Sequence, residues 1–289
     1  GSALAPTRIM EDFMGKKINY LQVFMSSLIF MSKLDEKIKN KENIGILLPP
    51  SLGAVISNIA LAIKGHVSVN LNYTLKNDVL EKVIKTGDVN YIISSEKFMD
   101  KQKIIINREI IYIEDILKNI TLKDKLLSLI KIFILPKNLF DYDKKSPATI
   151  IFTSGSTGNP KGVMLSHENI LSNIEGMSDV FNLQKDDIVL GFLPFFHSFG
   201  YTATLWMPIL KGISAVYHVN PLDSKKIGQL AKKYKTTIMM STPTFLNSYI
   251  KKCEDDDFKT VRVLLTGAEK LKKENVTAFE EKFGVTPME

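Results

Sequence analysis

Residues 153–162 (TSGSTGNPKG) have the composition of a loop that binds phosphate. Three glycines permit positive φ angles, so backbone N–H groups can converge on an anion. Four hydroxyl side chains add neutral donors, and Lys161 adds one positive charge. The apolar run at residues 149–152 directly before the loop is typical of a buried strand. The segment therefore predicts a polyphosphate cradle at the end of a strand.

The residues around Lys161 exclude two common phosphate-binding motifs. A Walker A loop has Gly immediately before its Lys and Ser or Thr after it, whereas here Pro160 precedes Lys161 and Gly162 follows. The dinucleotide-binding pattern G-x-G-x-x-G is also absent, because Thr157 stands two residues after Gly155. These flanking residues disfavour an ordinary P-loop ATPase or kinase. Hydrolysis of Mg-ATP that is lost in Lys161→Ala would make that class an alternative again.

Two further segments place ligand-binding residue types after predicted strands. Residues 192–200 (FLPFFHSFG) surround His197 with aromatic side chains, and an imidazole can donate a hydrogen bond to a carboxylate or phosphoryl oxygen. Residues 266–271 (TGAEKL) put small residues after a strand, where ligands approach the backbone of open α/β sheets. Taken alone, each segment also fits a structural role, as an ordered turn or a plain strand–helix connection.

Other catalytic chemistry is not indicated by the sequence. No paired carboxylates, metal-ligand cluster or nucleophile–base pair stands out, and the single cysteine, Cys253, excludes an internal disulfide. His66, His167 and His218 lie at the ends of predicted strands, where we expect structural roles.

Short apolar runs alternate with helical patterns along most of the chain. The runs expected as strands are residues 44–48, 67–71, 90–93, 104–112, 149–152, 162–165, 188–192, 214–217, 237–240 and 262–265. Continuous apolar strands that alternate with helices are typical of parallel sheets covered on both faces. So many strands favour an α/β fold with two mainly parallel β-sheets flanked by helices.

Three local expectations concern helices. Residues 19–39 show an amphipathic helical pattern. Thr74 is expected to cap a helix that ends at Gly87. Residues 126–135 (LLSLIKIFIL) are too short to span a bilayer, and they are expected to form a buried or interfacial helix, or else one that faces lipid or an acyl chain.

The three candidate segments together resemble the AMP-forming acyl-activating superfamily, which includes acyl-CoA synthetases, luciferases and peptide-synthetase adenylation domains. Residues 71–75 (LNYTL), PFFHSFG and GAEKLK are most similar to the acyl-acyl-carrier-protein synthetase branch, which is often fused to a 2-acylglycerophosphoethanolamine acyltransferase. The resemblance implies ATP-dependent activation of a fatty acid to acyl-AMP. Transfer to the phosphopantetheine thiol of acyl carrier protein or coenzyme A would follow, with ATP and Mg²⁺ as cofactors. A nucleotide-binding module without turnover is the alternative.

The resemblance also assigns roles to individual residues. It places His197 beside the acyl carboxylate and the adenylate phosphate as the catalytic residue, and Phe196 at the gate of the acyl pocket. Residues 241–243 (STP) would help to wall that pocket. The loop residues that would grip the β- and γ-phosphates are Thr153, Ser154, Gly155, Ser156, Thr157, Gly158 and Lys161. Those on the adenine side would be Gly267, Ala268 and Glu269. No metal ligand is assigned.

The resemblance further implies an incomplete N-terminal domain of an adenylate-forming enzyme. Residues 17–289 would be the truncated AMP-binding domain, with the C-terminal catalytic domain absent, and residues 1–16 a leader or cloning remnant. The family's Tyr-Gly-x-Thr-Glu motif, which stacks on adenine and holds Mg²⁺, does not occur before Glu289. We therefore expect negligible adenylation by this chain alone.

The charge pattern bears on partners. The net charge is +7, but the lysines are scattered in pairs without a basic arm, which argues against nucleic-acid binding. The expected location is cytoplasmic, with the inner face of the cell membrane as the other option through parts of the protein outside this chain. An acyltransferase or membrane domain before Gly1 stays open, as do acyl chain length and oligomeric state.

Overall fold

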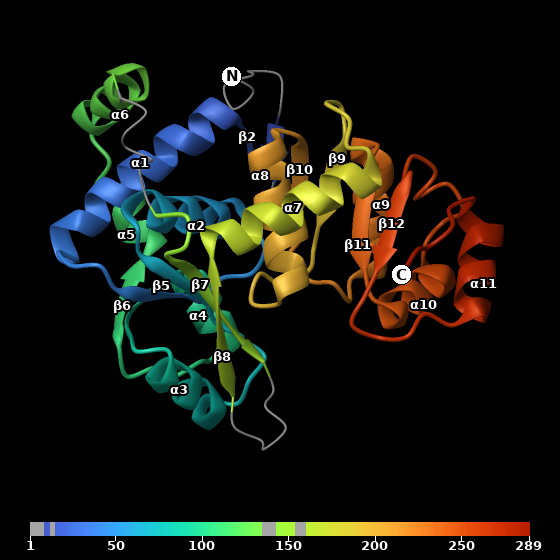
Figure 1. The fold of residues 1–289 in the computed structure, drawn as a ribbon, viewed down its shortest axis with the longest axis horizontal. Coiled ribbons are helices and arrows are strands. Elements are labelled where there is room, and N and C mark those ends of the chain that lie inside the picture. Colours follow the sequence, from blue (N-terminus) through green and yellow to red (C-terminus); the bar gives the residue numbers. More distant parts are fainter. Residues whose placement is uncertain (1–8, 12–14, 135–142, 154–159) are drawn as a thin grey trace. The chain divides into compact units, whose positions relative to one another are not determined.

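The computed structural model describes residues 9–11, 15–134, 143–153 and 160–289, which form helices and two six-stranded sheets (Figure 1). The chain divides into two compact units. Unit 1 comprises residues 1–20, 49–52 and 172–289, and unit 2 comprises residues 21–48 and 53–171. Ten of the twelve strands pair in parallel with at least one neighbour. The predicted α/β class with two mainly parallel sheets is confirmed.

The sheet of unit 1 is parallel except at one edge, where β1 and β2 pair antiparallel. Its strand order is β12-β11-β9-β10-β1-β2. The bounds are β1 Ile9–Glu11, β2 Lys17–Asn19, β9 Ile188–Gly191, β10 Ser214–Tyr217, β11 Ile238–Ser241 and β12 Val263–Thr266. The segment 1–16, expected as a leader, thus contributes β1, whereas the division into domains stays a prediction.

The sheet of unit 2 is also parallel except at one edge, where β7 and β8 form an antiparallel pair. Its strand order is β6-β5-β3-β4-β7-β8. The bounds are β3 Asn43–Ile46, β4 Val67–Asn70, β5 Val89–Ser94, β6 Glu109–Tyr112, β7 Pro147–Thr153 and β8 Lys161–Ser166. Branched aliphatic residues from neighbouring strands, such as Val69, Ile92 and Ile150, form one buried cluster, which explains why these runs carry little polar alternation.

Helices connect most of these strands. Their bounds are α1 Tyr20–Lys37, α2 Leu52–Lys64, α3 Asn77–Thr86, α4 Glu96–Gln102, α5 Ile113–Lys118, α6 Leu122–Ile134, α7 His167–Phe181, η3 Gly200–Trp206, α8 Met207–Lys211, α9 Ser224–Tyr234, α10 Pro243–Lys252 and α11 Lys273–Phe283. In the described part of the chain, no helix combines the length and apolar character needed to cross a membrane.

The predicted cap at Thr74 is wrong. Helix α3 begins at Asn77 instead, and its N-cap residue Lys76 offers no side-chain cap. Thr74 donates from its backbone N–H and its hydroxyl to the side chain of Asn72, at 2.9 and 2.7 Å. An Asn that bonds the backbone two residues later forms a turn, which competes with an earlier helix start. Gly87 ends the helix as predicted.

The structure shortens one predicted strand and, for one predicted helix, excludes the buried alternative. The strand predicted over residues 104–112 is only four residues long, because β6 begins at Glu109 while Ile104 and Ile106 pack against the core from a non-strand backbone. The helix predicted over residues 126–135 is α6, and it is not a buried helix. Leu126 is 59% exposed and Ile130 is 41% exposed.

The carboxylate of Asp187 ties together the beginnings of the strands in unit 1. It accepts hydrogen bonds from Gln184 N at 2.7 Å, from Thr237 Oγ1 at 2.6 Å and from Arg262 Nε at 2.9 Å. Its backbone oxygen accepts from Ser214 N at 3.1 Å. These residues immediately precede or begin β9, β10, β11 and β12. One residue therefore aligns the amino ends of four neighbouring strands.

The pKa of Asp187 reflects this network. Burial alone would raise it, but the hydrogen bonds from Arg262, Thr237 and Gln184 outweigh the loss of hydration, and the pKa lies below its ordinary value of 3.8. Since the folded pKa is depressed, the stabilisation is present above the unfolded pKa and is lost as pH falls through the folded pKa.

We expect Asp187→Asn to lower the free energy of unfolding by roughly 3 kcal/mol, because Arg262 would keep its charge without a counterion while staying partly exposed. The loss of stability between neutral and acidic pH should also become shallower. Urea unfolding at neutral pH and near pH 3 measures both effects. Asp256→Asn is the matched control, since its ion pair with Lys232 is exposed to solvent and should change the stability little. Equal effects of the two substitutions would contradict the assigned role of Asp187.

Candidate functional site

The predicted phosphate cradle closes a β-hairpin. Strands β7 and β8 pair antiparallel, with Thr153 opposite Lys161 and Phe152 opposite Gly162. Thr153 and Lys161 are both exposed, so the hydroxyl and the ammonium group flank the connection from its two ends. The other predicted cradle residues lie outside the described residues: Ser154, Gly155, Ser156, Thr157 and Gly158.

Gly162 lets the returning strand lie close to β7. A Cβ atom at this position would come within 2.9 Å of Ile150 Cγ2 and 3.1 Å of Phe152 Cζ. Both are side-chain atoms of the facing strand, so any larger residue would push β8 away from its partner. The glycine after Lys161 is thus required by packing in the hairpin, in addition to any role beside a ligand.

The other candidate residues lie at the carboxyl edge of the sheet in unit 1. Strands β9, β11 and β12 run parallel, so the segments that follow Gly191, Ser241 and Thr266 emerge at the same edge. Ligands of open α/β sheets bind at this edge. The fold therefore brings the segments 192–200, 241–243 and 266–271 to one side of the sheet, as their sequence patterns suggested.

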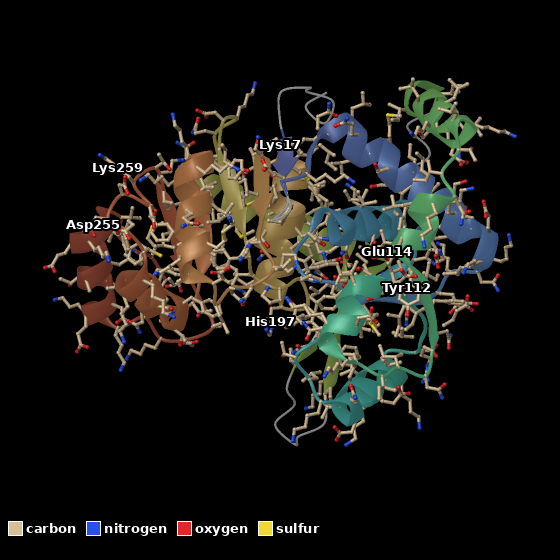
Figure 2. The ribbon with its side chains drawn as sticks, turned by 180° about the vertical axis from the view of Figure 1, so that it is seen from behind. Lys17, Tyr112, Glu114, His197, Asp255 and Lys259 are labelled. Carbon is tan, nitrogen blue, oxygen red and sulfur yellow. The ribbon has the colours of Figure 1, made fainter. Side chains whose placement is uncertain are left out.

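His197 lies in a tight turn at this edge (Figure 2). His197 N donates to Pro194 O at 3.2 Å, and Tyr201 N donates to His197 O at 2.8 Å. Phe195 and Phe196 are buried beneath the turn, whereas the His197 side chain is exposed. The ring centroids of Phe196 and His197 are 4.5 Å apart. The turn thus holds an exposed imidazole above buried aromatic side chains.

The protonation of His197 follows from this setting. Partial loss of hydration against the surrounding protein lowers the pKa of His197 below its ordinary value of 6.5. The neutral imidazole therefore predominates at neutral pH and keeps one N–H donor. It can donate to an anionic oxygen without bringing a full positive charge.

The segment after β12 meets the ends of its neighbours. Gly267 N donates to Ser241 O at 3.2 Å, which joins the ends of β12 and β11. A Cβ atom at Gly267 would lie 3.5 Å from Cε1 of Phe199, an ordinary contact distance. Glu269 accepts from Thr244 Oγ1 at 2.6 Å, and Ala268 has a φ of 69°. The structure therefore brings together the aromatic–His segment and the small-residue segment within unit 1.

The structure adds three residues that the sequence reasoning missed. Phe199 lies where a side chain at Gly267 would reach it, and Thr244, in the first turn of α10, donates to Glu269. Met288 O accepts from Thr266 N at 2.7 Å in a parallel bridge beside β12. The spacing of Thr244 after the STP segment could have indicated its position, whereas a single bridging residue such as Met288 carries no sequence signal.

The remaining histidines and the cysteine have structural surroundings. His66 Nδ1 accepts from Glu42 N at 3.1 Å, and His218 is buried with Nε2 3.3 Å from Asp223 Oδ2. His167 begins α7, and burial lowers its pKa. Burial also raises the pKa of Cys253 to about 12, so its thiolate form is scarce. Among the described residues, no group of three or more His, Cys, Asp or Glu side chains could hold a metal ion.

Gly200 joins the His197 turn to the π-helix η3. A Cβ atom there would lie 2.2 Å from Pro194 O and 2.8 Å from Leu193 O, which are both backbone atoms. Helix α8 follows η3 directly, and Met207 N donates to Thr202 O five residues earlier. Irregular helices of this kind occur often at functional sites.

We expect Gly200→Ala to lower the free energy of unfolding by roughly 3 kcal/mol, because the methyl group must displace backbone rather than a flexible side chain. Chemical denaturation measures the change. Gly176→Ala in α7 is the control, since a Cβ atom there meets nothing within 4 Å, and alanine should raise helix stability by up to about 1 kcal/mol. If Gly200→Ala is as stable as the parent, then the turn can accommodate a Cβ atom at this position, and the predicted clash with the backbone is wrong.

The chain is similar to curated acid–coenzyme A ligases. The chain is 27% identical over 260 residues to 4-coumarate--CoA ligase 4 of Arabidopsis thaliana, covering 85% of this chain and 45% of the relative. It is 26% identical over 330 residues to the long-chain-fatty-acid--CoA ligase of Bacillus subtilis (strain 168), covering 98% of this chain and 56% of the relative. The chain therefore spans about half the length of the curated relatives it matches.

Solved structures share the fold at low sequence identity. The fatty acyl-adenylate ligase from L. pneumophila, in complex with acyl adenylate and pyrophosphate, matches with a TM-score of 0.78 and 20% identity, over 96% of this chain and 50% of that one. ATP-bound MatB from Rhodopseudomonas palustris matches with a TM-score of 0.79 and 19% identity, over 97% of this chain and 56% of that one.

The family assignment rests on a match over nearly the whole chain. Residues 5–289 match the AMP-binding enzyme family. The finer likeness to the acyl-acyl-carrier-protein synthetase branch is not shown by these relatives, which are coenzyme A ligases. The chain belongs to the AMP-binding enzyme family.

Proposed function

We propose that the protein containing this chain activates a fatty acid with ATP and transfers the acyl group to a phosphopantetheine thiol. A carboxylate oxygen of the acid attacks the α-phosphorus, the bond to the β-phosphate breaks, and pyrophosphate leaves. The thiol sulfur then attacks the acyl carbonyl and AMP leaves. The observation that carries this proposal is the hairpin, in which Thr153 and Lys161 flank a glycine- and hydroxyl-rich connection.

The residue roles follow the chemistry of each position. Lys161 supplies positive charge to the β- and γ-phosphates, together with the loop residues 153–158. Neutral His197 donates a hydrogen bond to the acyl carboxylate or the adenylate phosphate. Phe196 borders the acyl group, and the segment Gly267, Ala268 and Glu269 borders adenine. These are proposals for each position within its own unit.

A protein nucleophile is not needed for this reaction. The carboxylate of the acid is the nucleophile, so the enzyme mainly positions reactants and neutralises charge. Mg²⁺ accompanies ATP in reactions of this kind and neutralises phosphate charge when bound. We propose no residue of this chain as its ligand.

The identity of the acid rests on the relatives. The B. subtilis relative is named for long-chain fatty acids and covers 98% of this chain, and the structural neighbour from L. pneumophila is a fatty acyl-adenylate ligase. The plant relative is named for 4-coumarate, an aromatic acid, which makes an aromatic acid the second candidate. Both curated relatives are named as coenzyme A ligases, which supports coenzyme A as the acceptor of the acyl group. Acyl carrier protein as the acceptor is the finer alternative, carried by the sequence resemblance.

Lys161→Ala should weaken the binding of ATP by about 10- to 100-fold, because one charge-assisted contact to phosphate is lost. Isothermal titration with a non-hydrolysable ATP analogue measures the dissociation constant for this chain. Lys144→Ala is the matched control, an exposed lysine in the same unit, and should bind like the parent. Equal affinity of both variants and the parent would remove Lys161 from the phosphate site.

Acid-dependent pyrophosphate exchange tests the reaction itself. We expect the longest native polypeptide that carries this chain to exchange pyrophosphate into ATP with long-chain fatty acids, and weakly with 4-coumarate. His197→Ala should lower the rate roughly 100-fold. Because the pKa of His197 is lowered, the parent's rate should stay level across neutral pH and fall only below the ordinary histidine range. An exchange rate that is the same without acid would refute fatty-acid activation.

A further inference from the structure

Helix α6 contacts the protein through its polar side. Its Asp124 lies 3.6 Å from Lys33 Nζ on α1, and its Ser128 is buried. Both residues line a small hollow between the two helices, together with Leu28 and Ile29 of α1. In both views α6 lies alongside α1 (Figures 1 and 2).

The opposite side of α6 is apolar and exposed. Leu122, Leu126 and Ile130 follow one another at four-residue spacing and therefore form one stripe, and they are 83%, 59% and 41% exposed. Leu127 borders the stripe and is 44% exposed. An amphipathic helix of a globular domain normally turns such a stripe toward the core. Here the orientation is reversed, so the stripe is available to a partner.

The exposed charges of α6 are all positive. Lys123 and Lys125 are exposed beside the stripe, and Lys131 is exposed at the hollow beside α1. Asp124 is the helix's one acidic residue and is paired with Lys33. The combination of a leucine-rich stripe and exposed lysines is typical of helices that lie in the interface of anionic membranes.

The orientation of α6 is held from within the protein. Thr121 donates from its backbone N–H and its hydroxyl to Asp124 Oδ2, both at 2.8 Å, and Asp124 N donates back to Thr121 Oγ1 at 3.2 Å. This reciprocal arrangement caps the helix as a capping box does. The Asp124 carboxylate also pairs with Lys33. The same group therefore caps α6 and holds the polar side of α6 against α1.

We propose that α6 docks the protein on the surface of an anionic phospholipid bilayer. The apolar stripe enters the boundary between headgroups and acyl chains, and Lys123 and Lys125, which flank the stripe, contact the headgroup phosphates. A second copy of the chain is a less suitable partner for α6, because the lysines of the two α6 helices would repel each other. A helix of 13 residues is also only about 20 Å long, which is little for a stable dimer interface. The docking does not depend on the proposed enzymatic reaction.

Vesicle binding tests the proposal directly. The parent chain should co-sediment with vesicles of phosphatidylcholine and phosphatidylglycerol and much less with phosphatidylcholine alone. The double substitution Leu126→Gln and Ile130→Gln should weaken binding at least about tenfold. Lys123→Gln with Lys125→Gln should weaken it roughly tenfold at low salt. Circular dichroism melting should be unchanged in each case, since the replaced side chains are exposed.

The matched controls lie elsewhere in the chain. Leu222→Gln removes a leucine that is 65% exposed outside α6, and Lys251→Gln with Lys252→Gln removes an exposed lysine pair on α10. Both should bind vesicles like the parent. A fluorophore on Leu126→Cys should shift to shorter wavelength with anionic vesicles, while one on Leu222→Cys should not. The native Cys253 is buried and will not compete for the label.

Three results would overturn the proposal. The parent chain could fail to bind anionic vesicles, or the α6 substitutions could bind as tightly as the parent. Analytical ultracentrifugation could also reveal self-association that Leu126→Gln with Ile130→Gln abolishes, without any vesicle binding. That last result would assign the stripe to a second copy of this chain.

Discussion

The alignment of strands in unit 1 depends on one carboxylate. Asp187 sits where β9 begins, and it holds Thr237 before β11 and Arg262 before β12. Parallel strands that are fixed at their amino ends and have similar lengths also end together. The turn with His197, the end of β11 and the Gly267 segment therefore reach one edge of the sheet. A buried carboxylate is tolerated here because three donors replace its hydration.

Close backbone approaches then shape that edge. Gly200 lies against the carbonyl oxygens of Pro194 and Leu193, which folds the aromatic segment back on itself and leaves His197 exposed above buried Phe196. Gly267 approaches Phe199 at ordinary contact distance. In unit 2 the predicted phosphate loop is flanked by an antiparallel pair of strands, with the Cβ position of Gly162 close to Ile150. Many nucleotide sites have a strand-to-helix turn at this point instead. Each candidate segment is thus held by contacts inside its own unit.

Much of this arrangement could be predicted from the sequence. Buried parallel strands carry continuous apolar runs, so β9, β10 and β12 were located to within a residue or two. The predicted phosphate loop stands out because three glycines and four hydroxyl residues directly follow an apolar run, and its ligand stays a prediction. The residue types also indicated which chemistry each segment could perform.

The rest depended on contacts between distant residues. Strands of three residues such as β1 have no periodicity to detect, and the antiparallel direction of β8 is a property of its pairing. Thr74 has the residue type of a helix cap, but its backbone N–H bonds the side chain of Asn72 instead. The orientation of α6 could not be read from its composition, because burial of its polar side depends on Lys33 in another helix. The proximity of Phe199 to the Cβ position of Gly267 likewise involves residues 68 positions apart.

Amide hydrogen exchange with and without a non-hydrolysable ATP analogue tests the central claim most directly. If the hairpin and the carboxyl edge of unit 1 bind nucleotide, then peptides covering residues 153–166 and 266–271 should exchange more slowly when the analogue is present. Peptides from α6 and α11 should be unchanged. Protection confined to other segments, or no protection at saturating analogue, would contradict the account.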